Sequence, residues 1–170
     1  MIPPTFVIRE LHPEDSIPAI TILLHAAYAP LAAMGLQFVA AHQDDIVTAD
    51  RLQRGFAYVA TLEDAIVGTI TLYAPAAQNV CDWYQQPGVF RFGQFAVRPD
   101  LQRQGLGARL MRTVEDRALK EGGTELALDT AEGAIHLRRW YEAIGYRFVQ
   151  YVSWHDTNYR SVVLSKHLPA

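Results

Sequence analysis

The segment Val89 to Asp129 constrains the fold most, because it reads as a strand, a helix and a second strand in direct succession. Its start, VFRFGQFAV, is apolar on both faces, as in a buried strand, and Gly93 indicates a bulge or a close backbone approach. Apolar residues at helical spacing then run to the double glycine at 122–123, and 124–129 is again short and apolar. Such a crossover joins parallel strands, so the sequence predicts one parallel pair inside the sheet.

The rest of the chain predicts helices and antiparallel hairpins around that pair. Further strands are expected at Thr5–Glu10, Phe56–Leu62, Ala65–Tyr73, Tyr146–Trp154 and Tyr159–Leu164. Further helices are expected from about Ile17 to a stop at Tyr28-Ala29-Pro30, and at Asp44–Arg54 and Ala134–Ile144, the last with Leu137, Trp140, Tyr141 and Ile144 facing inward. Leu31 to Ala41 is only weakly periodic and receives no assignment. The predicted fold class is therefore a mixed α/β sheet.

Length and charge restrict the classes of protein that fit. A chain of 170 residues suits one domain, residues 1–170, which on folding buries roughly 70% of the unfolded chain's surface. The formal charge of -3 provides no basic field for nucleic acid or an anionic membrane. Cys81 is the only cysteine, which excludes an internal disulfide and a multi-cysteine metal site. No run reaches the ~20 apolar residues of a membrane span, so we expect a cytoplasmic protein without a metal.

The segment FGQFAVRPDLQRQGLGA, from Phe92 to Ala108, carries an anion-binding pattern. Gln102-x-x-Gly105-x-Gly107 stands between a strand and a helix, where glycines leave backbone N–H groups open to a bulky pyrophosphate. A nucleotide-binding P-loop does not fit, because Gly107 is followed by Ala-Arg instead of Lys and Ser or Thr. The glycine spacing also fails the dinucleotide-binding fingerprint.

This pattern, with Val97-Arg98-Pro99 at the strand end, resembles the signature of the GNAT superfamily of acyl-CoA-dependent N-acetyltransferases. The resemblance implies a mostly antiparallel sheet whose central parallel strands splay apart, with helices on both faces. It implies acetyl-CoA as acetyl donor, with its pyrophosphate on the 103–108 backbone and its pantetheine arm along the strand. The implied cofactor-binding residues are Phe95, Ala96, Val97, Gln102, Arg103, Gln104, Gly105, Leu106, Gly107 and Ala108.

The segment WYEAIGY at 140–146 resembles a second GNAT pattern, in which a tyrosine hydroxyl lies close to the coenzyme sulfur. The resemblance makes Tyr141 the candidate general acid, since a phenol held there can protonate the departing thiolate. The competing interpretation is that Tyr141 is only a core aromatic of an amphipathic helix.

The general base stays open. An amine with a pKa near ~10.4 must lose a proton before it can attack a thioester. Many family members use a glutamate on the strand before the loop, where this chain offers Gln94, which can only position water or substrate. Asp129 is the leading ionisable candidate, and Glu132 and Asp82 are alternatives.

The acceptor is expected to be a small-molecule or peptide amine, with no nucleic-acid or membrane partner. Tyr28, Trp83 and Tyr84 are candidate substrate-binding residues, because aromatics near loops often line small-molecule sites. The aromatic C-terminal hairpin is a candidate edge for a homodimer. The alternative function is a non-catalytic acyl-CoA-binding or sensing domain that has lost its base.

Overall fold

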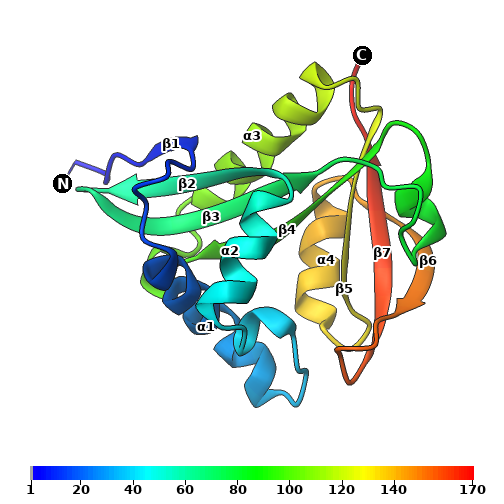
Figure 1. Cartoon of the computed structure of the whole chain (residues 1–170), viewed down its shortest axis with the longest axis horizontal. Coiled ribbons are helices and arrows are strands. Elements are labelled where there is room, and N and C mark those ends of the chain that lie inside the picture. Colours follow the sequence, from blue (N-terminus) through cyan, green and yellow to red (C-terminus); the bar gives the residue numbers. More distant parts are fainter. Residues whose placement is uncertain (1) are drawn as a thin grey trace.

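The computed structural model describes residues 2–170, and within them seven strands form one sheet in the order β1-β2-β3-β4-β5-β7-β6 (Figure 1). The strands are β1 Val7–Glu10, β2 Phe56–Leu62, β3 Ala65–Tyr73, β4 Val89–Val97, β5 Glu125–Ala131, β6 Arg147–Ser153 and β7 Arg160–His167. The helices are α1 Ile17–Ala33, α2 Asp45–Gln53, α3 Leu106–Lys120 and α4 Ile135–Ala143, with short 3-10 turns at Val39–Ala41, Asp82–Gln85 and Pro99–Leu101. The predicted mixed α/β class is confirmed.

The parallel pair β4 and β5 opens soon after it begins. The two strands pair in parallel at Val89–Arg91 with Glu125–Ala127, and every other neighbouring pair is antiparallel. Beyond this short ladder, β4 continues to Val97 along β3, and β5 continues to Ala131 along β7. The inner edge of β4 after Arg91 is therefore left without a strand partner, as the expected splay requires.

A bulge in β4 changes which side chains share a face. Thr71 pairs with Gly93 and Thr69 with Ala96, so two residues, Gln94 and Phe95, stand opposite one. Gln94 accommodates the extra residue with a left-handed φ of 49°. Because the alternation of side chains shifts by one at this point, Arg91 and Gln94 line the same pocket. The bulge indicated by Gly93 is confirmed, and its strained residue is Gln94.

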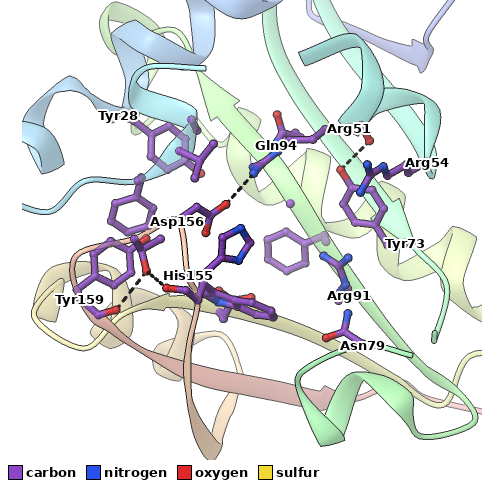
Figure 2. A pocket seen from close by; sticks show the side chains of 18 residues that line it. Tyr28, Arg51, Arg54, Tyr73, Asn79, Arg91, Gln94, His155, Asp156 and Tyr159 are labelled. Carbon is purple, nitrogen blue, oxygen red and sulfur yellow. Dashed lines mark hydrogen bonds and ion pairs between the residues drawn. The ribbon is translucent and has the colours of Figure 1, made fainter. Parts of the chain in front are cut away.

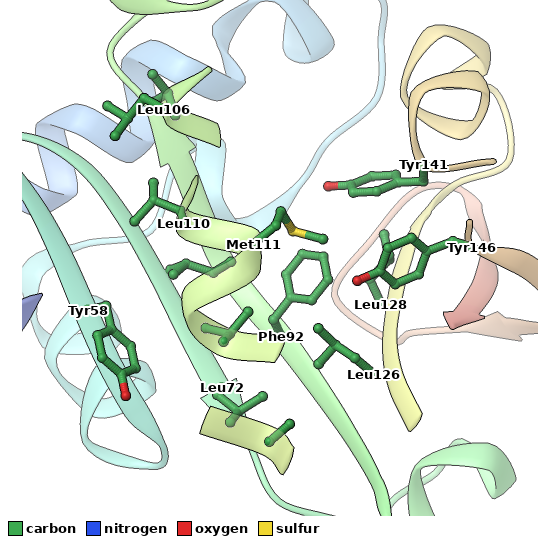
Figure 3. Packing of buried hydrophobic residues seen from close by; sticks show 14 of the residues in the cluster. Tyr58, Leu72, Phe92, Leu106, Leu110, Met111, Leu126, Leu128, Tyr141 and Tyr146 are labelled. Carbon is green, nitrogen blue, oxygen red and sulfur yellow. The ribbon is translucent and has the colours of Figure 1, made fainter. Parts of the chain in front are cut away.

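Helices cover both faces of the sheet. The apolar side of α3 packs with β3, β4 and β5, and Figure 3 shows Leu110 and Met111 beside Phe92, with Tyr141 and Tyr146 across the cluster. On the other face, α1 and α2 pack on Val59 and Ala96 through a separate cluster that includes Ile20, Leu24 and Leu52. No helix in residues 2–170 is long and apolar enough to span a membrane.

Two expectations about helices were wrong. Helix α1 continues through Pro30 to Ala33, and Gly35, with a left-handed φ of 81°, ends it. The Leu36 N–H reaches back to the Leu31 carbonyl at 3.1 Å, which is the closing bond expected after a glycine at a helix C-terminus. Trp140 does not face inward: it is 38% exposed and stacks on Phe95 at the surface.

Candidate active site

The loop before α3 has the conformation of an anion-binding site. Arg103 and Gly105 take left-handed φ values of 63° and 84°, and Gln102 donates through Nε2 to the Val97 carbonyl at 3.1 Å. Within residues 2–170, the backbone N–H groups of 103–108 donate no hydrogen bond, and the first to do so is that of Arg109, to the Gly105 carbonyl at 3.1 Å. Several unused N–H groups converge where the positive end of the α3 dipole lies, which suits a phosphate.

This loop lies on the α3 side of β4. A Cβ placed on Gly107 would be 3.5 Å from the Phe95 ring and 3.9 Å from a Val97 methyl, so Gly107 faces these two side chains. Nothing lies within 4 Å of a Cβ placed on Gly105, and the backbone there is open. A group as large as a pyrophosphate can therefore approach the main chain at Gly105 without displacing a side chain.

A pocket of about 290 Å³ lies on the other face of β4 (Figure 2). Its walls come from Tyr28 of α1, the turn at Phe38–Ala40, α2, β4, β5 and the 154–159 turn between β6 and β7. The amide of Asn158 connects that turn to the end of α1, because its Oδ1 accepts from the Gln37 N–H at 2.9 Å and its Nδ2 donates to the Gly35 carbonyl at 2.9 Å. Segments from both ends of the chain thus close one pocket.

Gln94 is buried and held in one orientation. Its Oε1 accepts a hydrogen bond from Gln43 Nε2 at 2.8 Å, and the same nitrogen of Gln43 donates to Thr48 Oγ1 at 2.8 Å. Thr48 in turn is bonded to Thr21 of α1 at 2.8 Å. Because its oxygen is already engaged, the Gln94 amide has its N–H₂ group left to offer a ligand.

Asp129 lines the same pocket with both carboxyl oxygens engaged. The Tyr84 hydroxyl donates to Oδ1 at 2.7 Å and the Trp154 indole N–H donates to Oδ2 at 2.8 Å. Burial raises the pKa of Asp129 above its usual value, against the lowering effect of these hydrogen bonds and of the nearby Arg91 charge. A carboxylate accepts up to about four hydrogen bonds, so each oxygen can still take one from a ligand.

Tyr141 lies across β4 from this pocket, on α4. It is 6% exposed, and its ring packs against Phe92 at 6.1 Å and Tyr146 at 5.9 Å between centroids. Figure 3 shows its hydroxyl directed from α4 toward β4. The hydroxyl has no hydrogen-bond partner within the described residues, and burial raises the Tyr141 pKa well above its ordinary value. The phenol is therefore protonated at neutral pH.

A family model for the acetyltransferase (GNAT) family matches residues 23–146, which is more than half of the chain. The chain belongs to the GNAT acetyltransferase family. A relative from Bacillus subtilis, named S-(2-succino)cysteine N-acetyltransferase, is 31% identical over 125 residues, covering 71% of this chain and 72% of the relative. The chain is accordingly an acyltransferase of the N-acetyltransferase class.

Solved structures share the fold. The ribosomal-protein-S18-alanine N-acetyltransferase of Escherichia coli matches 98% of this chain and 96% of its own, with a TM-score of 0.71 and 19% identity. A GNAT family acetyltransferase from Elizabethkingia anophelis with acetyl-CoA bound matches 96% of this chain and 98% of its own, with a TM-score of 0.66 and 18% identity. The expected GNAT fold is thus confirmed.

The structure places the sequence-predicted residues of this GNAT protein in four parts of the fold. Tyr28, Gln94 and Asp129 share the pocket. Tyr84 lies behind it, where it holds Asp129, and Trp83 packs away from it, with its backbone N–H bonded to Gln150 Oε1 at 3.2 Å. Tyr141 lies on α4, and the predicted cofactor-binding residues form the loop and the adjoining end of β4.

Sequence reasoning missed three arginines of the pocket, which are Arg51 of α2, Arg54 directly after α2 and Arg91 of β4. A signal existed for Arg91, because a charge inside the apolar strand VFRFGQFAV requires either a partner or a ligand. Arg51 stands in an ordinary amphipathic helix and carried no such signal. In the described part of the chain, no group of three or more His, Cys, Asp or Glu side chains is arranged to hold a metal ion.

Proposed function

We propose that this protein transfers an acetyl group from acetyl-CoA to an amine bound in the pocket. The observation that carries the proposal is that an open anion-binding loop and a polar pocket flank the same strand, β4, where β4 and β5 separate. The family uses acetyl-CoA, and the fold neighbour from Elizabethkingia anophelis has it bound. Acetyl-CoA supplies the acetyl group as a reactive thioester.

The backbone of residues 103–108 would hold the coenzyme's pyrophosphate. Its free N–H groups fit this role, and each charge-assisted hydrogen bond contributes on the order of 1.5–3 kcal/mol. The edge of β4 beyond Arg91 fits the pantetheine arm, because Ala96 and Val97 pair with β3 on one side and have no strand on the other. Phe95, Ala96 and Val97 would thereby direct the thioester into the gap between the strands.

Tyr141 would protonate the departing sulfur. Its raised pKa keeps the proton on the phenol until a thiolate forms beside it, and its hydroxyl is free to donate. Asp129 would accept the proton of the acceptor amine, directly or through a water molecule. Burial suits it to this role, because a raised pKa makes a carboxylate a stronger base at neutral pH. Gln94 would orient the amine or the water through its free N–H₂ group.

The acceptor would be a small-molecule or peptide amine. The relative from Bacillus subtilis is named for an amino acid, S-(2-succino)cysteine, that carries an amine and several carboxyl groups. A pocket of about 290 Å³ suits an acceptor of that size, and we include this amino acid among the acceptors to be tested.

Release of free coenzyme thiol tests the proposed function. Pure protein with acetyl-CoA should release thiol with at least one amine of a panel that contains S-(2-succino)cysteine, other amino acids, small alkyl amines and peptides. Calorimetry with coenzyme A in parallel measures binding without chemistry. Coenzyme binding with no thiol release from any amine would contradict catalysis and favour an acyl-CoA sensor, for which the absence of a carboxylate at Gln94 is the motivating observation.

A further inference from the structure

The most unusual side chain of the pocket is Arg91. It is half-buried on β4, and its guanidinium makes no hydrogen bond or ion pair with any residue from 2 to 170. Its five N–H donors are always charged, and none of its nitrogens is among the fully buried atoms that lack a partner, so a ligand that enters the pocket can reach them. Figure 2 shows the Arg91 side chain directed into the pocket.

The protein holds Arg91 in position without neutralising it. The guanidinium carbon lies 4.5 Å from the centroid of the Tyr73 ring and 5.3 Å from that of Tyr84. Tyr73 is itself fixed, because its hydroxyl donates to the Arg51 carbonyl at 2.8 Å. Contacts with aromatic faces orient a cation but leave its in-plane N–H donors free. Arg91 is therefore positioned for an anion that lies in the pocket.

Neighbouring groups favour an anion at the same place. Asn79 lies beside Arg91 in Figure 2, and its Oδ1 accepts from the Cys81 N–H at 2.9 Å, which leaves its N–H₂ group to donate. Arg51 is paired only loosely, with its Nη2 atom 3.7 Å from Asp156 Oδ2. The pocket lining holds three arginines, at 51, 54 and 91, against two aspartates, at 129 and 156. Arg54 is paired with Asp50 at 2.6 Å and points to solvent.

We propose that Arg91 binds a carboxylate of the acceptor, so that the acceptor is an anionic amine of the amino-acid type. Arg91 and Asn79 receive the carboxylate at one side of the pocket, and Arg51 serves a second carboxylate where the acceptor has one. The bulge in β4 puts Gln94 on the same face as Arg91, so an acceptor held at Arg91 extends its amine toward Gln94 and Asp129. This inference rests on the proposed function for its reaction, and on the pocket alone for its binding.

The test measures affinity in the absence of chemistry. Protein saturated with coenzyme A, which carries no acetyl group, is titrated with S-(2-succino)cysteine and with 2-(ethylthio)ethylamine, an amine of related shape without a carboxylate. We expect the dissociation constant of the carboxylated amine to be at least tenfold lower. The same ratio is measured in Arg91→Gln, in Arg91→Lys and in Arg112→Gln, a control that removes one exposed arginine of α3 outside the pocket.

Arg91→Gln should reduce the ratio to less than threefold, and Arg112→Gln should leave it unchanged. Arg91→Lys keeps the charge without the planar fork and should give an intermediate ratio. Melting temperature and coenzyme affinity show whether each variant is folded. The proposal is overturned if wild-type protein does not prefer the carboxylated amine, or if Arg91→Gln keeps the preference, as it would if Arg91 served only to balance Asp129. If wild-type protein prefers the carboxylated amine but releases no thiol with any amine, the proposed acetyl transfer is wrong and the proposed anion site at Arg91 still holds.

Discussion

At the scale of single residues, Tyr141 and Tyr146 belong to one aromatic cluster but differ in what their hydroxyls contact. The Tyr146 hydroxyl donates to Glu115 at 3.3 Å, whereas that of Tyr141 has no partner among residues 2–170. The Tyr141 hydroxyl is not among the fully buried polar atoms that lack a partner, so a ligand or a reacting atom can reach it. The pair therefore offers a matched comparison for the proposed acid.

We predict that Tyr141→Phe lowers kcat at least tenfold, because general acid catalysis typically contributes about 10²–10⁴-fold. The dissociation constant of coenzyme A should change less than threefold, since the ring and its packing remain. Steady-state thiol release and calorimetry measure the two quantities. Tyr146→Phe, the control, should retain kcat within threefold. An unchanged kcat in Tyr141→Phe would exclude the tyrosine as the acid.

Gly105 provides a second prediction at this scale. Its φ of 84° is left-handed, and a Cβ there meets no atom within 4 Å, so a substitution is opposed by backbone conformation alone. We expect Gly105→Ala to lower the free energy of unfolding by about 1–2 kcal/mol and to weaken coenzyme A binding. Gly107→Ala, where φ is ordinary and the nearest contact is 3.5 Å, should change stability by less than about 0.5 kcal/mol. Urea unfolding followed by fluorescence measures the stability of both variants. Equal losses of stability in the two variants would contradict the argument that the left-handed backbone of Gly105 requires glycine.

At the scale of elements, α1 shows how a local stop signal was overridden. Pro30 lacks the N–H of an interior helical residue, yet the helix continues to Ala33 and ends at Gly35. Leu31, one residue beyond Pro30, is buried with Ala131 and Ala134. Packing of the last helical turn against β5 and the start of α4 offsets the missing backbone hydrogen bond.

This arrangement predicts opposite effects for two alanine substitutions. Pro30→Ala restores a backbone donor at an exposed helical position and should raise the free energy of unfolding by about 0.5–1 kcal/mol. Gly35→Ala places a Cβ on a left-handed residue and should lower it by about 1 kcal/mol. Chemical unfolding at one pH measures both. A loss of stability in Pro30→Ala would contradict this prediction and would indicate that the proline stabilises the protein by restricting the unfolded chain.

At the scale of the whole molecule, Glu125 connects the three strands on the far side of the splay. It lies on β5, is 5% exposed, and accepts hydrogen bonds from Arg147 of β6 at 3.0 Å and from Ser165 of β7. Burial opposes ionisation, but the bonds from Arg147 and Ser165 outweigh it and lower the pKa of Glu125. The ion pair is thus part of what holds β5, β6 and β7 together while β4 diverges.

Because the pKa of Glu125 is lowered in the folded protein, its contribution to the free energy of unfolding depends on pH. A carboxyl whose pKa falls on folding stabilises the protein above its unfolded pKa of 4.5, and this contribution is lost as pH falls through the folded value. We predict that Glu125→Gln is less stable than wild type at pH 7 and that the difference shrinks below pH 4.5. Urea unfolding at pH 7, 5, 4 and 3 measures the difference. The control is Glu142→Gln, at an exposed glutamate of α4, and its free energy of unfolding should change with pH as that of wild type does. If Glu125→Gln is less stable than wild type by the same amount at every pH, the predicted link to the Glu125 pKa is wrong.

The sequence by itself determined the succession of strands and helices along the chain, the parallel crossover and the glycine loop before α3. These features are local, because side-chain periodicity, proline and glycine act over a few neighbouring residues. Strands β2, β3 and β4 agree with the predicted bounds for this reason. The separation of β4 and β5 was predicted only from the resemblance of Gln102 to Ala108 to the GNAT signature, because no periodicity in a sequence indicates where two strands separate.

Only the tertiary structure decided the pocket beside β4. Arg51, Arg91, Asp129 and the 154–159 turn come from four separate segments, and Asn158 closes the pocket on Gln37, 121 residues away in the chain. Whether the Arg91 guanidinium has a partner within the protein or is free to bind a ligand depends on which carboxylates and carbonyl groups fold beside it. No sequence pattern predicts that. Contacts between distant segments determine desolvation and pairing, and these set the chemistry of a charged side chain.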